Sequence, residues 1–174
     1  MRYICLMRNL VLFLFLALSF HGHTQSIQEI QSQIDLSVWK PFKKAFEDLD
    51  GPALNAIYAA DVLRVTPEGI DTQNAFKPKN LERFEKNKKD GVSIALDFWF
   101  DSRKTNLDTS YEVGFYRIGF TDKEGKTNFV YGQFHIVLKK IKGEWKITQD
   151  WDTTTINGKA IAAEDFENKP VLRF

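Results

Sequence analysis

The sequence predicts an α+β domain in which helices come first and a mainly antiparallel sheet follows. Between positions 35 and 58, apolar residues recur at steps of three and four, which is the spacing of amphipathic helices. From Val92 to about Thr154, long β-type runs alternate with short turns that contain Gly, as in hairpins. Because helices and strands occupy separate parts of the chain, an α+β domain is favoured over alternating βαβ units.

Two helices are predicted at the start of this domain. Asp35 or Ser37 caps the first, whose apolar face consists of Leu36, Trp39, Phe42, Phe46 and Leu49. The sequence Asp50-Gly51-Pro52 ends it, and Pro52 suits the first turn of a second helix that carries Leu54, Ile57 and Tyr58. We interpret Asp61 as a cap or turn residue at the end of this second helix.

A short strand at 62–66, stopped by Pro67-Glu68-Gly69, leads to a charged surface helix over 78–90 that Gly91 closes. Turns at 122–125 and 142–143 help to separate the longer strands that follow, Ser93–Asp101, Thr109–Thr121, Lys126–Lys140 and Glu144–Thr154. The domain is thus expected over 35–154, with a C-terminal tail at 155–174.

Residues 1–25 have the three-part pattern of a secretory signal peptide: Arg2 and Arg8, an uncharged apolar run over 10–20, and a short polar end. The apolar run is shorter than the roughly 20 residues that cross a bilayer as a permanent helix. We therefore expect cleavage near Thr24–Ser26, release into the periplasm or the medium without a stable membrane anchor, and a flexible lead-in at 26–34.

Composition excludes several classes of function for the mature chain. Without residues 1–25 it carries 22 basic and 23 acidic residues, which gives no electrostatic reason to bind nucleic acid. Cys5 is the only cysteine and leaves with the signal, so disulfides and thiol chemistry are not expected. His135 is then the only histidine, which gives no cluster with metal-ligand spacing. We expect no metal and no cofactor.

Several strings, in this order, resemble one known family. They are Asp48-Leu49-Asp50, Tyr58-Ala59-Ala60-Asp61, Pro67-Glu68-Gly69, the stretch 110–116, and the stretch 132–139 followed by 143–147. Together they resemble nuclear transport factor 2-like domains, particularly the SnoaL-like branch, over about residues 36–154. The resemblance implies a cystatin-like cone, a curved sheet wrapped around three helices with a pocket at its open end. Isomerases, cyclases, dehydratases, carriers and association modules share this fold, so it does not give the function.

Steroid double-bond isomerisation, the best-known chemistry of this superfamily, uses a tyrosine, an aspartate base and a second, protonated acid. The resemblance places these three positions on Phe42, Thr66 and Gln133. Phe42 has no hydroxyl, Thr66 is no base near neutral pH, and Gln133 donates only weakly. We therefore expect no ketosteroid isomerase activity.

Alternation along the strands predicts which side chains face the pocket. Trp145 and Ile147 are interpreted as core positions, which places Gln149 and Trp151 on the same face and Asp150 and Asp152 on the opposite one. By similarity, the inward positions on the two preceding strands are Gln133, His135 and Val137, and Ser110, Glu112, Gly114 and Tyr116. A shift of one residue would invert each set.

Glu112 and His135 are the candidate catalytic pair. Partial burial would raise the pKa of Glu112 and suit it to acid–base chemistry, and Glu112 could orient His135. The alternatives are an ion pair of Glu112 with Arg64 or Arg117, simple exposure of Glu112, and His135 as a satisfied wall residue.

An aromatic and amide-lined pocket would suit a small, largely apolar molecule. Its predicted lining is Tyr58, Arg64, Thr66, Trp99, Tyr116, Gln133, Gln149 and Trp151, with the face of Trp99 left open. Phe134, Ile136 and Leu138 are expected on the outer sheet face, where they need covering, so a homodimer is predicted. The leading function is an exported small-molecule-binding protein. The alternatives are a cofactor-free isomerase, dehydratase or cyclase that uses Glu112 and His135, and a homodimeric association module.

Overall fold

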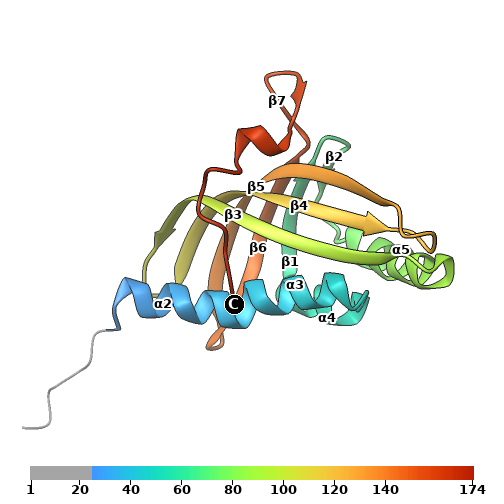
Figure 1. The fold of residues 1–174 in the computed structure, drawn as a ribbon. Helices are drawn as coiled ribbons and strands as arrows, with labels where there is room; N and C mark the ends of the chain where they lie inside the picture. Colours follow the sequence, from blue (N-terminus) through green and yellow to red (C-terminus); the bar gives the residue numbers. More distant parts are fainter. Residues whose placement is uncertain (1–24) are drawn as a thin grey trace, which may run out of the picture.

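The computed structural model describes residues 25–174, so the predicted signal segment lies outside the described residues except for Gln25 (Figure 1). The described chain begins with α2 (Ile27–Ile34), which continues through a π-helical turn, η1 (Asp35–Trp39), into α3 (Lys40–Glu47). Ser26 Oγ accepts from the backbone of Glu29, whose carboxylate accepts from the backbone N–H of Ser26. Ile30 and Ile34 are fully buried. Segment 26–34, which we expected to be a flexible lead-in, is therefore a capped and packed helix.

The break between the first two helices follows the predicted signals. Leu49 adopts a left-handed conformation with φ of 56°. Asp50 then caps α4 (Gly51–Ile57), because its side chain accepts from the backbone N–H of Ala53 at 2.9 Å. The third helix, α5 (Phe76–Asp90), ends at Gly91, whose φ of 70° closes the helix as the sequence predicted.

One curved sheet of six strands wraps around these helices, in the order β2-β1-β6-β5-β4-β3 (Figure 1). Its strands are β1 (Tyr58–Thr66), β2 (Gly69–Asp71), β3 (Ser93–Thr105), β4 (Thr109–Thr121), β5 (Thr127–Ile141) and β6 (Glu144–Thr153). All neighbours are antiparallel except β1 and β6, which run parallel. The predicted α+β class is confirmed.

Trp39 lies at the centre of the core between the helices and the concave face of the sheet. Its ring centroid is 4.9 Å from that of Phe98, 5.3 Å from Phe100 and 5.1 Å from Phe134. Such edge-on and tilted contacts between large rings stabilise the fold by more than the burial of their apolar area alone would. The predicted apolar face of the first helix is therefore confirmed for Trp39, Phe46 and Leu49, whereas Leu36 is 62% exposed.

Strand β5 has the opposite facing to the one predicted. Phe134, Ile136 and Leu138 are buried in the core, whereas Gln133 and His135 point to the convex outer face. The prediction of an apolar patch on the outer face is therefore wrong. These three residues cannot form the interface of the predicted homodimer. In such a strand, apolar residues alternate with polar or small ones, so the sequence defines two different faces. Packing against the rest of the protein decides which of the two faces points inward.

Strand β6 changes face at a β-bulge. Leu138 pairs with Ile147 and Val137 pairs with Gln149, so Thr148 is the extra residue. Trp145 and Ile147 are buried as predicted, but beyond the bulge Asp150 and Asp152 turn inward. The predicted inward positions of Gln149 and Trp151 are wrong for this reason.

The segment after residue 154 forms a strap over the outer face and one edge of the sheet. It contains the short hairpin β7 (Thr155–Ile156) and β8 (Lys159–Ala160) and a 3₁₀ turn, η2 (Ala163–Asp165). Phe166 is fully buried against Trp99, Phe115 and Tyr131. Further on, Phe100 donates its backbone N–H to Pro170, and Leu172 donates to Phe98, which covers the free edge of β3.

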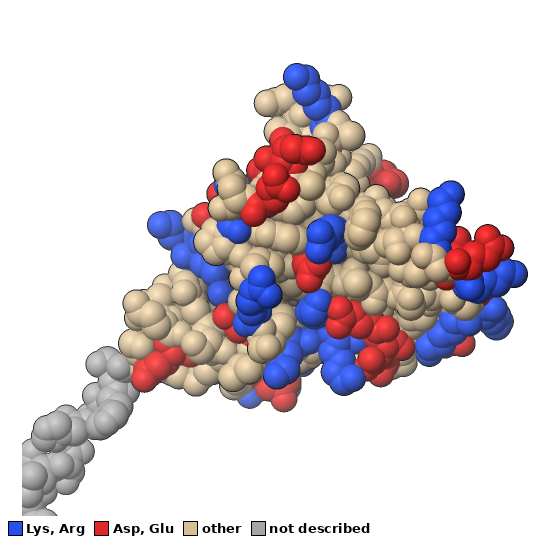
Figure 2. Space-filling view, in the orientation of Figure 1, with Lys and Arg blue, Asp and Glu red and all other residues tan. Residues whose placement is uncertain are grey.

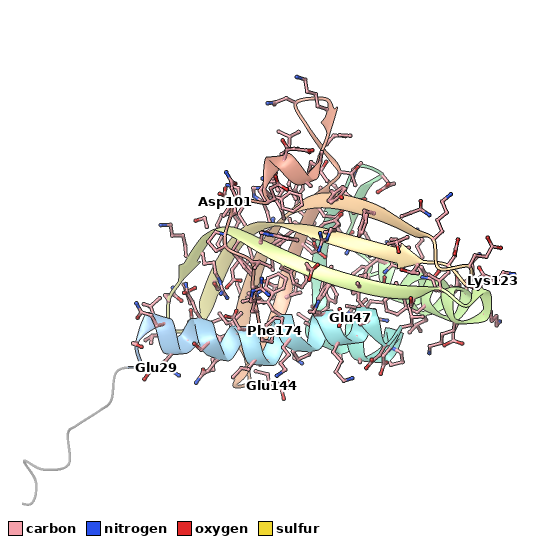
Figure 3. All side chains as sticks on the ribbon, in the orientation of Figure 1. Glu29, Glu47, Asp101, Lys123, Glu144 and Phe174 are labelled. Carbon is pink, nitrogen blue, oxygen red and sulfur yellow. The ribbon has the colours of Figure 1, made fainter. Side chains whose placement is uncertain are left out.

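Charges of both signs are interspersed on the face shown in Figure 2. Glu29, at the start of α2, and Lys123, in the turn between β4 and β5, mark opposite ends of the molecule (Figure 3). Among residues 25–174, no helix has the length and hydropathy needed to cross a membrane.

Candidate functional site

A cavity of about 260 Å³ lies between the helices and the concave face of the sheet. It adjoins a second, wider hollow of about 660 Å³ at the open end of the cone, and the two share Arg64, Asn80 and Arg83 in their walls. We call the first the inner cavity and the second the mouth. Most residues that line the inner cavity are apolar, among them Phe42, Phe46, Leu54, Leu96, Phe98, Ile118, Phe120, Val130, Phe134 and Ile136, and polar side chains share the surface that faces the cavity.

A hydrogen-bonded polar cluster occupies one side of the inner cavity. Arg64, on β1, donates to Asp150 at 2.8 Å and to Asp152 at 2.6 Å, both on β6. Tyr58 donates its hydroxyl to the same oxygen of Asp150 at 2.9 Å. The cluster depends on the parallel pairing of β1 with β6, which places Arg64 opposite Asp150. It also depends on the bulge at Thr148, which turns both aspartates inward.

Burial and charge act in opposite directions in this cluster. Burial raises the pKa of Asp152 to about 6, although Arg64 favours its charged form. Burial alone would lower the pKa of Arg64, but Asp150 and the other groups around it reverse this and raise it. Arg64 is therefore a permanent cation that pairs with both aspartates, and Asp152 changes its charge near pH 6.

Tyr116 lies on β4 in the wall of the inner cavity, directly over Gly132 of β5. A Cβ atom at Gly132 would stand 2.3 Å from the Tyr116 hydroxyl oxygen, so only glycine leaves room for this ring. Among residues 25–174, the Tyr116 hydroxyl makes no hydrogen bond to another side chain or to the backbone. It is therefore free to contact a molecule in the cavity.

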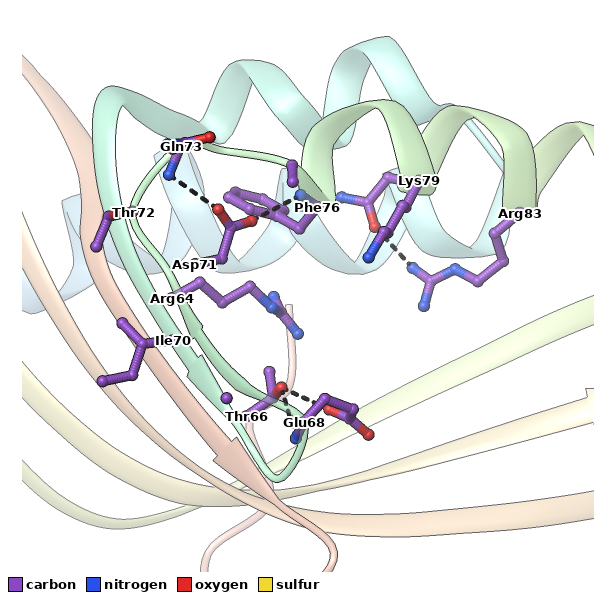
Figure 4. A pocket seen from close by; sticks show the side chains of 13 residues that line it. Arg64, Thr66, Glu68, Ile70, Asp71, Thr72, Gln73, Phe76, Lys79 and Arg83 are labelled. Atoms are coloured by element: carbon purple, nitrogen blue, oxygen red, sulfur yellow. Dashed lines mark hydrogen bonds between the residues drawn. The ribbon is translucent and has the colours of Figure 1, made fainter.

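The mouth is bounded by the β1–β2 hairpin on one side and by α5 on the other (Figure 4). Asp71 caps the start of α5, accepting from the backbone of Gln73 and Phe76 at 2.9 Å and 2.8 Å. At the hairpin, the Thr66 hydroxyl donates to the Glu68 carboxylate, and the backbone N–H of Glu68 donates to the oxygen of the same hydroxyl at 3.3 Å. Arg83 extends from α5 toward this space. Both acids of the hairpin thus have local partners of their own.

The structure brings only part of the predicted pocket together. Tyr58, Arg64 and Tyr116 line the inner cavity, and Thr66 lies at the mouth. Gln133, Gln149 and Trp151 point to the outer face because of the facing of β5 and the bulge in β6. Trp99 also lies outside, since its ring packs against Phe166 of the strap at 4.8 Å.

Glu112 and His135 lie on opposite faces of the sheet, so the predicted catalytic pair is not formed. Glu112 is fully buried and accepts hydrogen bonds from Trp39, Arg103 and Ser110. Its ion-pair partner is Arg103, not Arg64 or Arg117.

His135 lies on the outer face, where its Nδ1 is 2.6 Å from the Tyr111 hydroxyl and its ring meets the edge of Trp151 at 4.6 Å. Neither Glu112 nor His135 lines either hollow. A role in acid–base chemistry in the cone therefore has no geometric basis for this pair.

Four site residues were missed by the sequence reasoning: Asp150, Asp152, Asn80 and Arg83. No local sequence pattern predicts the β-bulge at Thr148 that turns the two aspartates inward. The spacing of α5 was informative, however, because Asn80 and Arg83 are three residues apart and share a helix face with Phe84 and Phe76. In residues 25–174 no group of three or more His, Cys, Asp or Glu side chains could hold a metal ion.

No protein-family model matches the sequence, and the search of curated proteins found no significant relative. Solved structures do match. A conserved protein from Planctomyces limnophilus is similar over 72% of this chain and 96% of its own, with a TM-score of 0.61 and 19% identity. A nuclear transport factor 2-like superfamily protein from Salmonella enterica is similar over 78% of this chain and 100% of its own, with a TM-score of 0.56 and 12% identity. The chain has the nuclear transport factor 2-like fold.

A third structure with this fold, a protein of unknown function from Shewanella oneidensis, matches over 71% of this chain and 98% of its own, with a TM-score of 0.54 and 18% identity. The nuclear transport factor 2-like fold agrees with the cone that the sequence resemblance implied. At such low identity the similarity establishes the fold, and the function has to be argued from the residues of the cavity.

Proposed function

We propose that this chain is an exported protein that binds a small, largely apolar molecule in the inner cavity. The supporting observation is the inner cavity itself, whose lining residues are mostly apolar and include one ion-paired cluster and one free hydroxyl, Tyr116. Ligand sites typically combine an apolar wall with a few polar groups that orient the ligand. A volume of about 260 Å³, extended by the mouth, suits a molecule of one or two rings.

Binding can be tested with the neutral fluorescent probe N-phenyl-1-naphthylamine. Val130 lines the cavity and is 40% exposed, so Val130→Trp can fill the entrance without overpacking the core. We expect the wild type to bind the probe and Val130→Trp to bind it at least about tenfold more weakly, a loss of about 1.4 kcal/mol. Leu107→Trp, at a residue that is 65% exposed and outside the cavity, is the matched control and should bind like the wild type. Equal binding by Val130→Trp and the wild type would refute the site.

Export is supported by the signal-like pattern of residues 1–25. The intact mass of the protein recovered from the envelope or medium of a bacterial host should correspond to an N-terminus near Thr24–Ser26. A full-length chain retained in the cytoplasm would contradict export while leaving ligand binding open.

A cofactor-free proton-transfer enzyme is the second candidate, and Asp152 is the residue that favours it. A carboxylate with a pKa of about 6 in an apolar cavity is matched to proton abstraction near neutral pH. Exchange of the α-hydrogens of 2-tetralone, a flat apolar ketone, can be followed by NMR in deuterated water. Exchange that the wild type accelerates and Asp152→Asn does not would support an enzyme. Equal rates with both proteins and with buffer would leave binding as the function.

A further inference from the structure

Arg83 differs from every other charged group that lines the inner cavity, because it forms no ion pair with an oppositely charged side chain among the described residues. Arg64 pairs with both Asp150 and Asp152. Arg83 makes one side-chain hydrogen bond, from its NH2 to the neutral amide oxygen of Asn80 at 3.1 Å. A guanidinium can donate five hydrogen bonds, so most of the donors of Arg83 remain available to a ligand.

The position of Arg83 is fixed by its surroundings. Its Cζ atom lies 5.4 Å from the ring centroid of Phe46 and 5.1 Å from that of Phe84, distances typical of cation–π contacts. Asn80 is itself oriented, because its amide nitrogen donates to Asn55 at 3.1 Å and so presents the oxygen to Arg83. The guanidinium is thus held in place before any ligand arrives, which reduces the entropy lost on binding.

Arg83 lies where the inner cavity meets the more polar mouth. It lines both the inner cavity and the mouth, and it projects from α5 into the space between them (Figure 4). A molecule whose apolar body fills the inner cavity would therefore place its outer end at this guanidinium.

The electrostatic surroundings of Arg83 also favour an added negative charge. Partial removal from water lowers the pKa of Arg83 and the positive charge of Arg64 lowers it further, while the more weakly acting charge of Asp152 raises it. The acids nearest to it in the two hollows already have partners: Asp150 and Asp152 pair with Arg64, Asp71 with the start of α5, and Glu68 with Thr66. An anion bound at Arg83 would offset the repulsion by Arg64 and give the guanidinium a charged partner.

We propose that the ligand is a monocarboxylate with an apolar body, and that Arg83 binds its carboxylate at the junction of the inner cavity and the mouth. This inference rests on the proposed binding function and adds the chemical class of the ligand. The planar guanidinium can meet a carboxylate with two parallel hydrogen bonds, which gives both strength and orientation.

The first test compares ligands that share a skeleton and differ only in charge. Calorimetry at about pH 8, where a free carboxyl group is ionised, measures 2-naphthoate against 2-naphthalenemethanol, and octanoate against octanol. We expect the acids to bind about tenfold or more tightly than the matched alcohols, because a hydrogen bond to a charged group contributes that much. The acid that binds more tightly, 2-naphthoate or octanoate, shows whether the site favours a flat body or a flexible chain.

The second test uses variants of Arg83. Arg83→Met keeps an apolar stem on Phe46 and Phe84 and should abolish the preference for the acid, measured as the ratio of the acid and alcohol affinities of the same variant. Arg83→Lys keeps the charge and should retain part of the preference. Lys86→Met is the matched control, because Lys86 lies on the same helix, pairs with Asp90 and lines neither hollow.

The outcomes separate this inference from the proposed function. Equal affinity of the wild type for acid and alcohol, or a preference that survives in Arg83→Met, would overturn the carboxylate site and leave the binding function standing. Failure of the wild type to bind any of the four molecules or the neutral probe would remove both. The comparison of ligands on the wild type needs no variant, so it decides the question even if Arg83→Met fails to fold.

Discussion

The indole Nε1 of Trp39 donates a hydrogen bond of 2.7 Å to Oε2 of Glu112, and this contact joins the centre of the helix layer to the inner face of β4. The other oxygen of Glu112 accepts from Ser110 at 2.9 Å and from Arg103 at 3.1 Å. Burial raises the pKa of Glu112, and these three donors oppose that effect. The carboxylate is thus a fully satisfied buried group, whose role is to hold the helices and the sheet together.

Replacing Glu112 should therefore reduce stability and leave the cavity intact. In Glu112→Gln an NH₂ group faces one of the three donors, so we expect the free energy of unfolding to fall by about 2 kcal/mol. Denaturant unfolding measures the change, and Glu124→Gln, in an exposed turn, is the control. Probe binding at the inner cavity should be unchanged, whereas a variant of full stability with lost binding would indicate that Glu112 acts on a ligand.

The raised pKa of Asp152 predicts how stability depends on pH. Its pKa is about 6 in the folded protein and 3.8 for the unperturbed group, so the folded state holds this proton more tightly than the unfolded state. As pH rises from about 4 to about 6, ionisation of Asp152 therefore lowers the free energy of unfolding, by about 2 kcal/mol.

Asp152→Asn removes this contribution, so the stability of the wild type relative to the variant should decrease across that interval. Unfolding curves of both proteins at several pH values measure the difference, which cancels the titration of the groups that do not interact with Asp152. A difference that stays constant, or that increases with pH, would contradict the folded-state pKa.

Two strand glycines should respond very differently to alanine. A Cβ atom at Gly114 would lie 2.3 Å from the carbonyl oxygen of Trp99, which belongs to the backbone and cannot move aside. At Gly119 the nearest atom, at 3.0 Å, is in the half-exposed ring of Phe129. We expect Gly114→Ala to destabilise the fold by about 3 kcal/mol and Gly119→Ala by less than about 0.5 kcal/mol. Thermal unfolding distinguishes them, and equal effects would show that the β3–β4 spacing adapts easily.

The strap should contribute to stability through Phe166. This ring is 1% exposed and stacks on Phe115 at 5.3 Å, so Phe166→Ala removes a large buried side chain and leaves a cavity. We expect a loss of about 3 kcal/mol in the free energy of unfolding. Phe174→Ala, at a residue that is 45% exposed, is the control and should change little. A Phe166→Ala protein as stable as the wild type would mean that the strap is dispensable.

The predicted homodimer remains a prediction. Light scattering on the mature protein at micromolar concentration should give the mass of a dimer. The interface would have to use outer-face residues other than Phe134, Ile136 and Leu138, because these three are buried within one chain. A monomer mass would refute the dimer.

The sequence by itself determined the class of the main helices and long strands between residues 35 and 154. Helical spacing from Leu36 to Leu49, the stop at Asp50-Gly51-Pro52 and the turns between the long strands each depend on neighbouring residues, which the sequence displays directly. It also contained a signal that was not used: Asn157-Gly158 is a two-residue hairpin turn, with φ of 52° and 77°, and it shapes the start of the strap. The strands that carry Arg64 and Tyr116 and the inward face of Tyr116 were predicted correctly for the same reason. Tyr58 and Asp61, which were predicted to belong to the second helix and its end, lie in β1 instead.

Only the tertiary structure decided which face of β5 and of the second half of β6 points inward. Alternation has a period of two, so it defines two faces and leaves the choice between them to packing against the helices. One extra residue, Thr148, then exchanges the faces and brings Asp150 and Asp152 in place of Gln149 and Trp151. The inward face of β5 carries Phe134 and Ile136, so His135 lies on the outer face of the sheet and Glu112 of β4 on the inner face. The site is therefore made of groups whose meeting depends on long-range pairing, β1 with β6 and α5 with the sheet, which no local pattern specifies.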